Sequence, residues 1–286
     1  MHRVGCCAPL VLALTLSGSS GAVSHTTEGT PPQRVVAPHT TVEVIADHEA
    51  VSPGASLWVG VRFVLEAGWH IYWLNPGDSG SAPTFDWHLP AGFSAGATEW
   101  PVPERLAEAS LVNYGYRGGV VFPTEIRSAG GFKAAGTVAI GVHVTWLVCR
   151  EICVTGHANL ELSLPVRLSN APSSSEGATL VAESRARVPR EAPSNWRATA
   201  RSDGDVFVLS IDTGAPVRGG VFFPLEVSQI DDAAPQRVTS FERGLRFTLR
   251  KSDQLMALPA ALTGVVQLLG GRAYVIRAPL ASATIR

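Results

Sequence analysis

Apolar residues recur at every second position over long stretches of this chain. Residues 57–65 and 138–148 show the pattern most clearly, and it returns in residues 206–211 and 245–249. Because successive side chains of a strand point to opposite faces of a sheet, a period of two predicts β-strands with one buried face. Turn-forming sequences separate the strands, as at Ser52-Pro53-Gly54, Glu66-Ala67-Gly68 and Asn75-Pro76-Gly77-Asp78. Short strands at this spacing predict an all-β fold made of antiparallel sandwiches.

A change of composition divides the chain near its middle. Residues 169–194 begin with a serine-rich and proline-containing run and continue as a polar stretch with room for one helix, which predicts a linker. Residues 40–168 form the first predicted β domain, and residues 195–286 form a second, smaller β-sandwich without cysteine. Residues 25–39 are expected to be a flexible segment ahead of the first domain.

The first 24 residues resemble a signal peptide. Arg3 gives a positive start, residues 8–16 form a short apolar core, and Ala22-Val23-Ser24 offers small residues at the cleavage positions. The mature protein is therefore expected to be periplasmic or secreted. Later apolar runs fall short of the roughly 18 to 20 residues that span a bilayer, so no transmembrane segment is expected in the mature chain.

Composition restricts the remaining possibilities. The chain has 286 residues, of which 45% are hydrophobic and 16% charged, enough for packed cores and unlike a disordered protein. The formal net charge is −1, and acidic and basic residues are interspersed. Nucleic-acid binding is not expected, because it draws on clustered positive charge. The sequence also lacks the zinc-protease and nucleophile-elbow motifs of common hydrolases.

Cysteine usage points to one candidate site. Beyond Cys6 and Cys7 in the leader, the chain contains only Cys149 and Cys153. Along one straight strand, residues four apart lie roughly 13 Å from each other, whereas a disulfide needs Cα atoms about 4.4 to 6.8 Å apart. Alternation resumes at residues 159–164, so a short loop at residues 150–152 is expected to bring the cysteines face to face if they bond. Cys149 should be reachable unless another segment covers it.

Three interpretations of this pair remain open on the residues alone. A structural disulfide closing so small a loop adds little stability, because the stabilisation grows with loop length. A metal site formed by Cys149, Cys153 and His157, perhaps with His143, lacks the usual spacing of structural zinc ligands. The third interpretation is a redox pair that exchanges with partner proteins. The many aromatic residues near position 70 also invite a sugar-binding interpretation, although such residues more often pack in the core.

Five motifs in order resemble the periplasmic N-terminal domain of the thiol:disulfide interchange protein DsbD, in the variant seen in ScsB-like proteins. They span about residues 40–166, and the segment after them resembles ScsB-like proteins more weakly. The motifs are Gly68-Trp69-His70-Ile71-Tyr72-Trp73-Leu74-Asn75-Pro76-Gly77-Asp78-Ser79-Gly80, Trp87-His88-Leu89-Pro90-Ala91-Gly92-Phe93, Trp100-Pro101-Val102-Pro103, Asn113-Tyr114-Gly115-Tyr116 and Trp146-Leu147-Val148-Cys149-Arg150-Glu151-Ile152-Cys153.

This resemblance implies an immunoglobulin-like sandwich in which Cys149 and Cys153 are the redox cysteines. It implies a component of a protein-disulfide reductase, which receives electrons from a membrane-embedded reductant and passes them to periplasmic thioredoxin-like or isomerase-type proteins. Because the chain has neither a multi-span domain nor a thioredoxin-like Cys-x-x-Cys domain, the reductant is expected to be a separate chain. A cap over the cysteines is expected between residues 100 and 116, and no cofactor or metal is expected. The alternative function is a binding or adhesion module with a structural disulfide.

Overall fold

The structure is a computed structural model that describes residues 1–2, 32–130, 136–167 and 174–281. The expected signal peptide, residues 1–24, lies outside this part of the chain except for its first two residues. Residues Pro31–Arg286 form one compact unit. The described residues are strands joined by turns, with a single α-helix among them, so the prediction of an all-β fold is confirmed. That helix is too short to cross a membrane, and the described residues contain no other candidate.

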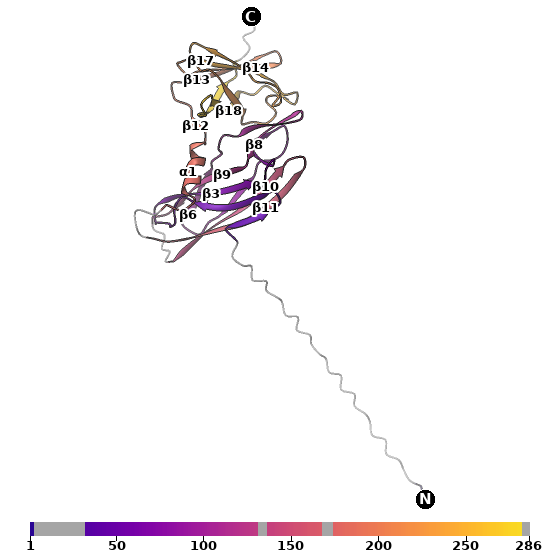
Figure 1. Cartoon of the computed structure of the whole chain (residues 1–286), viewed down its shortest axis with the longest axis vertical. Coiled ribbons are helices and arrows are strands. Elements are labelled where there is room, and N and C mark those ends of the chain that lie inside the picture. The colour runs from indigo at the N-terminus through magenta and orange to yellow at the C-terminus, as the bar shows by residue number, and fades with distance from the viewer. Residues whose placement is uncertain (3–31, 131–135, 168–173, 282–286) are drawn as a thin grey trace. The chain divides into compact units, whose positions relative to one another are not determined.

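Two antiparallel sheets face each other in the first sandwich, residues 34–165 (Figure 1). The first has the order β1-β2-β3-β9-β6, and the second has the order β11-β10-β4-β8-β7, with β5 paired to β10. The strands are β1 (Arg34–Ala37), β2 (Thr40–Ala46), β3 (Ser56–Leu65), β4 (His70–Gly77), β5 (Thr84–His88), β6 (Phe93–Thr98), β7 (Glu104–Glu108), β8 (Leu111–Arg117), β9 (Gly119–Ser128), β10 (Thr137–Cys149) and β11 (Cys153–Pro165).

The core between these sheets follows from the alternation in the sequence. Along β10 every second side chain from Val138 to Trp146 is buried, and β2 and β3 bury their alternate residues against it. Phe63 meets the ring of Trp146 edge to face, with centroids 5.7 Å apart. Gly156 is the cross-strand partner of Trp146, and a Cβ there would lie 2.3 Å from the indole. A glycine at this position therefore gives the tryptophan its place in the core.

Two segments differ from expectation. Residues 34–37, within the segment expected to be flexible, form β1 and pair with β2. A turn was expected at residues 75–78, but β4 continues to Gly77 with an irregularity between Tyr72 and Gly77. The buried Asn75 explains this course: its Nδ2 donates to the carbonyl of Pro224 at 2.9 Å, and its Oδ1 accepts from the Gly77 amide at 3.0 Å. The bond from the Gly77 amide forms an Asx turn, and Gly77 has φ +84°, so the turn that the composition favours is present within the irregular end of β4.

The second sandwich, residues 190–279, consists of two sheets with four strands each. Their orders are β12-β19-β18-β15 and β13-β14-β17-β16. The strands are β12 (Arg190–Glu191), β13 (Arg197–Asp203), β14 (Val206–Asp212), β15 (Gly220–Pro224), β16 (Arg237–Phe241), β17 (Gly244–Arg250), β18 (Ala261–Leu268) and β19 (Ala273–Pro279). Phe207, Phe222 and Phe247 lie at the centre of its own hydrophobic core.

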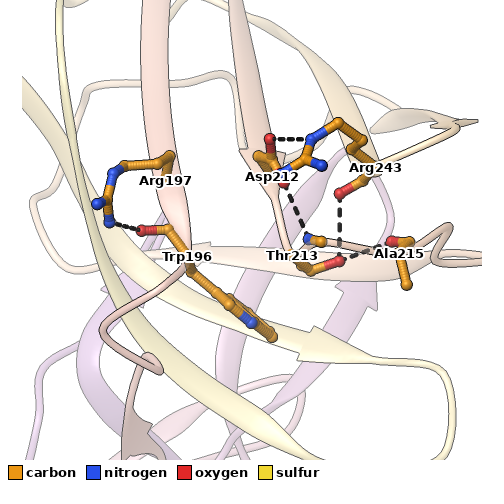
Figure 2. Close-up of polar contacts among 7 residues, drawn as sticks. Trp196, Arg197, Asp212, Thr213, Ala215 and Arg243 are labelled. Atoms are coloured by element: carbon orange, nitrogen blue, oxygen red, sulfur yellow. Dashed lines mark hydrogen bonds and ion pairs between the residues drawn. The ribbon is translucent and has the colours of Figure 1, made fainter.

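Polar contacts close the turn that follows β14 (Figure 2). Arg243 Nε donates to Asp212 Oδ2 at 2.8 Å, and the Thr213 hydroxyl donates to the carbonyl of Ala215 at 2.7 Å. The hydrogen bond from Arg243, followed by one from the Gly214 amide, lowers the pKa of Asp212. The turn is thus held by a carboxylate that stays ionised, and it carries no further chemistry.

The segment predicted as a linker contains the helix α1 (Ala178–Ala186). This helix packs on β9 of the first sandwich: Val181 is buried, and the Ser184 hydroxyl donates to the carbonyl of Val121 at 2.5 Å. Immediately afterwards, β12 pairs with β19 of the second sandwich. The segment therefore makes ordered contacts with both sandwiches.

Direct contacts also join the two sandwiches at β4 and β8. Phe223 of β15 packs edge to face on Trp73 and Tyr114, with ring centroids 6.2 and 5.4 Å away. The Tyr114 hydroxyl donates to Asp232 Oδ1 at 2.8 Å, and the Arg105 guanidinium donates to the carbonyl of Asp232 at 2.5 Å. Arg105 of β7 and Tyr114 of β8 therefore fix this hairpin to the second sandwich, and Trp73 of the adjoining strand β4 adds a third contact.

Candidate functional site

The two cysteines join the ends of neighbouring strands. Cys149 ends β10 and Cys153 begins β11; they are cross-strand partners, bonded as a disulfide with Cα atoms 4.2 Å apart. The turn of residues 150–152 between them is closed by the Arg150 amide, which donates to the carbonyl of Ile152 at 3.0 Å. The predicted chain reversal and the facing of the cysteines are both confirmed.

The two sulfur-bearing residues differ in accessibility. Cys149 is only 2% exposed, whereas Cys153 is exposed. The difference arises because β10 has a neighbour on each side: Cys149 pairs with Cys153 of β11 and also with His70 of β4, while β11 is the edge strand of its sheet. The conditional expectation that Cys149 is reachable therefore fails, because β4 and its neighbours cover it. Of the two residues, Cys153 is the one accessible to solvent.

Two aromatic residues of β4 lie on the same side of the sheet as the disulfide. His70 and Tyr72 are two residues apart on one strand, so their side chains share a face, and their rings meet edge to face at 5.1 Å. The Tyr72 hydroxyl lies 3.9 Å from Cys153 Sγ. The Tyr72 ring packs against the backbone of Gly80, where a Cβ would lie 2.1 Å from the ring and φ is +91°. Burial, and then the nearby Glu108 carboxylate, raise the pKa of Tyr72.

The β7–β8 hairpin reaches His70, the residue of β4 that pairs with Cys149. Glu108, the last residue of β7, places Oε1 3.3 Å from Nδ1 of His70, and the tight turn after it has Ala109 at φ +53°. The His70 side chain is 0% exposed. Burial lowers the pKa of His70, Glu108 opposes this effect, and Arg117 adds to it. This hairpin lies within residues 100–116, where a cap is expected.

The rim of the site combines an exposed apolar residue with stacked rings. Ile152 in the cysteine turn is 65% exposed. Beside it, the Arg150 guanidinium lies over the Trp69 ring, with Cζ 5.4 Å from the ring centroid. The Trp69 ring also stacks on the ring of His39, with the two ring centroids 3.6 Å apart. The rim thus offers a partner an apolar contact next to Cys153 and a positive group on a rigid aromatic support.

The ring centroids of His143 and His157 lie 6.3 Å apart, but these histidines do not come together with the cysteines. His157 lies four residues along β11 from Cys153, which in an extended strand is roughly 13 Å. His143 Nδ1 is 2.7 Å from Asn159 Oδ1, and both cysteines are bonded to each other. Among the described residues, no group of three or more His, Cys, Asp or Glu side chains is placed to hold a metal ion.

Sequence reasoning did not assign His70, Tyr72 or Glu108 to the site. His70 and Tyr72 belong to the Gly68-to-Gly80 motif, which precedes the cysteines by about 80 residues. Their spacing of two places both side chains on one face of a strand, and this was the signal available in the sequence. No pattern in the sequence marked Glu108 individually, because its contact with His70 depends on how β8 pairs with β4. The aromatic residues of the sugar interpretation mostly lie inside: Trp69, Tyr72 and Trp73 are buried.

Comparison with known proteins identifies the first sandwich. The family described as thiol:disulfide interchange protein DsbD, N-terminal, matches residues 41–165. The N-terminal periplasmic domain of ScsB from Proteus mirabilis has a similar structure, with a TM-score of 0.61 and 18% sequence identity over 87% of this chain and 98% of that one. The E. coli chaperone DraB, at a TM-score of 0.24 and 9% identity over 84% of this chain and 97% of that one, is too distant to inform the argument. No curated protein matches the sequence.

The class of the first sandwich follows from these matches and from the cysteine hairpin. It has an immunoglobulin-like fold similar to that of the ScsB domain, and its residues 41–165 match the DsbD N-terminal family model. More specifically, residues 41–165 form a DsbD N-terminal-like domain, and the resemblance of the sequence motifs to that family is confirmed.

Proposed function

We propose that this protein is an extracytoplasmic thiol:disulfide exchange module that acts through Cys149 and Cys153. The observation that carries the proposal is the asymmetry of the pair within a DsbD N-terminal-like domain: Cys153 is exposed at the rim, and Cys149 is buried behind it. An exposed sulfur is what a partner sulfur has to reach, and a buried second cysteine is protected from other oxidants while it completes the exchange.

The proposed exchange has two steps. In the reduced protein, the Cys153 thiolate attacks a partner disulfide, forming a mixed disulfide while the partner's other sulfur leaves as a thiolate. Cys149 then attacks Cys153 Sγ, so that the Cys149–Cys153 bond forms and the partner's second sulfur leaves. Two electrons pass from the dithiol to the partner. A separate membrane-embedded reductant returns the pair to the dithiol, and thioredoxin-like or isomerase-type proteins receive the electrons.

The location is proposed on two grounds. The first 24 residues have the features of a signal peptide, and the similar ScsB domain is a periplasmic one. Thiol exchange of this kind also needs a compartment in which disulfides persist. The competing function is a binding module whose disulfide is structural, and the loop it closes, with only three residues between the cysteines, is too short for large entropic stabilisation.

The redox potential of the pair separates these functions. The purified protein is equilibrated in thiol:disulfide buffers, and alkylated cysteines are counted by mass. The reduction potential of an exchange pair is expected to lie above roughly −300 mV, so the pair is already reduced in a buffer poised at that value. A disulfide that stays oxidised in buffers below roughly −300 mV, in the native protein, is structural.

Trapping then tests the order of the cysteines. Cys149→Ala keeps the exposed thiol and is expected to accumulate mixed disulfides with partner proteins. Cys153→Ala keeps only the buried thiol and is expected to form few. Equal trapping by both variants would contradict the assigned order, and absence of trapping by either would favour the binding module.

A further inference from the structure

The imidazole of His70 is buried without the hydrogen bonds that such a group normally has. Its side chain is 0% exposed, and neither ring nitrogen has a hydrogen-bond partner among the described residues. Nδ1 lies 3.3 Å from Glu108 Oε1, at ion-pair distance but without hydrogen-bond alignment, and Nε2 has no hydrogen-bond partner among the described residues. Buried polar groups are almost always paired, so an unpaired imidazole beside a redox pair calls for an explanation.

The position of His70 next to Cys149 explains why its imidazole is unpaired in the disulfide form. His70 and Cys149 are cross-strand partners on β4 and β10, which places their side chains on one face of the sheet with Cβ atoms about 4.5 to 5.5 Å apart. In the disulfide form, Cys149 Sγ is bonded to Cys153 and offers no proton. In the dithiol form, the same sulfur becomes a thiol next to an imidazole with a free nitrogen.

Cys149 needs such a neighbour. Only a thiolate attacks a disulfide, and burial disfavours the thiolate. Because Cys149 is 2% exposed, water has little access to take its proton. His70 is the base paired with it in register, and the carboxylate of Glu108, whose side chain is 32% exposed, connects the imidazole to solvent.

Resting on the exchange function proposed above, we propose that His70 accepts the proton of Cys149 when that cysteine resolves the mixed disulfide on Cys153. Glu108 acts as a positioning residue that stabilises the resulting imidazolium. The proton moves from Cys149 Sγ to His70, the thiolate attacks Cys153 Sγ, and the bond from Cys153 to the partner breaks. The partner sulfur leaves as a thiolate and takes a proton from solvent, while His70 returns its proton to solvent along Glu108.

The charges around His70 fit this role. The ionisable groups facing it are Glu108 from β7, Arg117 from β8, Tyr72 from its own strand and Cys149 from β10. Burial lowers the pKa of His70, which keeps the imidazole neutral and able to accept a proton at neutral pH. Glu108 opposes that effect, so its carboxylate favours the imidazolium that forms during the transfer. Tyr72 is kept protonated by its raised pKa and does not compete as a base.

The test uses oxidised glutathione as the partner of the reduced protein. The glutathione adduct on Cys153 and its resolution by Cys149 are followed by acid quenching and mass spectrometry between pH 5.5 and 9.5. A thiol with an ordinary pKa of about 8.5 is about 3% ionised at pH 7. Because burial disfavours the thiolate further, His70→Gln is expected to slow resolution on the order of ten-fold or more at pH 7, with the difference from wild type narrowing as the pH rises toward 9.5 and hydroxide replaces the base. Glu108→Gln is expected to slow resolution by a smaller factor.

The matched control is His157→Gln, the same substitution at an exposed position of the neighbouring strand, which should leave the profile unchanged. Resolution in His70→Gln at the wild-type rate throughout overturns the role of His70 and leaves the exchange function standing. A wild-type protein that forms no adduct at any pH overturns both.

A second measurement needs no substitution and holds if His70→Gln does not fold. The His70 ring is titrated by NMR in the oxidised and reduced wild-type protein. The His70 ring is expected to titrate differently in the two states and to show, in the reduced protein alone, a second inflection at the pH where Cys149 ionises, because an imidazole beside a thiol responds to its ionisation. Identical titration curves in the two states overturn the proposal.

Discussion

Replacing Asp232 by asparagine is expected to stabilise the folded protein at neutral pH. Asp232 is 4% exposed at the contact between the sandwiches, where its Oδ1 accepts the Tyr114 hydroxyl at 2.8 Å. Burial raises the pKa of Asp232 from 3.8 to about 6; the Tyr114 hydrogen bond and Arg105 oppose this, while Asp78 and Asp231 add to it. The ionised carboxylate is thus held in an environment that favours the neutral form.

The magnitude follows from the two pKa values. Between pH 3.8 and about 6 the folded state keeps the proton that the unfolded state has lost, so the free energy of unfolding falls as pH rises through this window. A difference of about two pH units, at about 1.4 kcal/mol each, gives a loss of at most about 3 kcal/mol. Asparagine does not ionise and still accepts the Tyr114 hydroxyl, so Asp232→Asn should remove this loss.

Urea unfolding followed by tryptophan fluorescence measures the effect. The stability difference between Asp232→Asn and wild type should be near zero at pH 3, about 1 kcal/mol at pH 4.5, and at most about 3 kcal/mol in favour of the variant at pH 7.5. Asp203→Asn, at an exposed carboxylate paired with Arg201, is the control and should stay within about 0.5 kcal/mol at each pH. A difference that does not change with pH, or a variant less stable at pH 7.5, would refute the reasoning.

Two other substitutions test the core and the rim. Gly156→Ala places a Cβ 2.3 Å from the buried Trp146 ring and should lower the free energy of unfolding by about 1 to 3 kcal/mol in urea titrations, whereas Gly130→Ala, with open space around it, should change it little; equal effects would contradict the packing described. Ile152→Ser, at an exposed position beside Cys153, should slow exchange with protein partners several-fold, while leaving the rate with glutathione and the stability nearly unchanged; loss of both rates would instead indicate damage to the disulfide itself.

The sequence pattern alone was sufficient to predict those strands in which buried and exposed side chains alternate regularly. The alternation in residues 57–65 and 138–148 predicts β3 and β10, and the need to reverse the chain between Cys149 and Cys153 predicts the hairpin. These features depend on neighbours within a few residues, so they can be predicted from a single sequence.

The missing parts depend on contacts distant in sequence. Whether Cys149 is covered depends on β4, which lies about 80 residues earlier, and the place of Glu108 depends on the register of β8 against β4. The course of β4 past Asn75 depends on carbonyl groups about 150 residues away. The Gly- and Pro-containing run forms a local turn at Gly77, and the long-range partner of the buried Asn75 amide fixes where that turn lies in the fold.

The contact between the sandwiches means that the segment matched by the family and the compact unit of the structure have different limits. The family match ends at residue 165, but the surface of β4 and β8 is completed by Phe223 and Asp232. A fragment cut at the end of the match would leave Trp73 and Tyr114 facing water and would release the hairpin that carries Glu108 from its support. Redox measurements on such a fragment would describe a site with a loosened cover, and would not transfer to the intact protein.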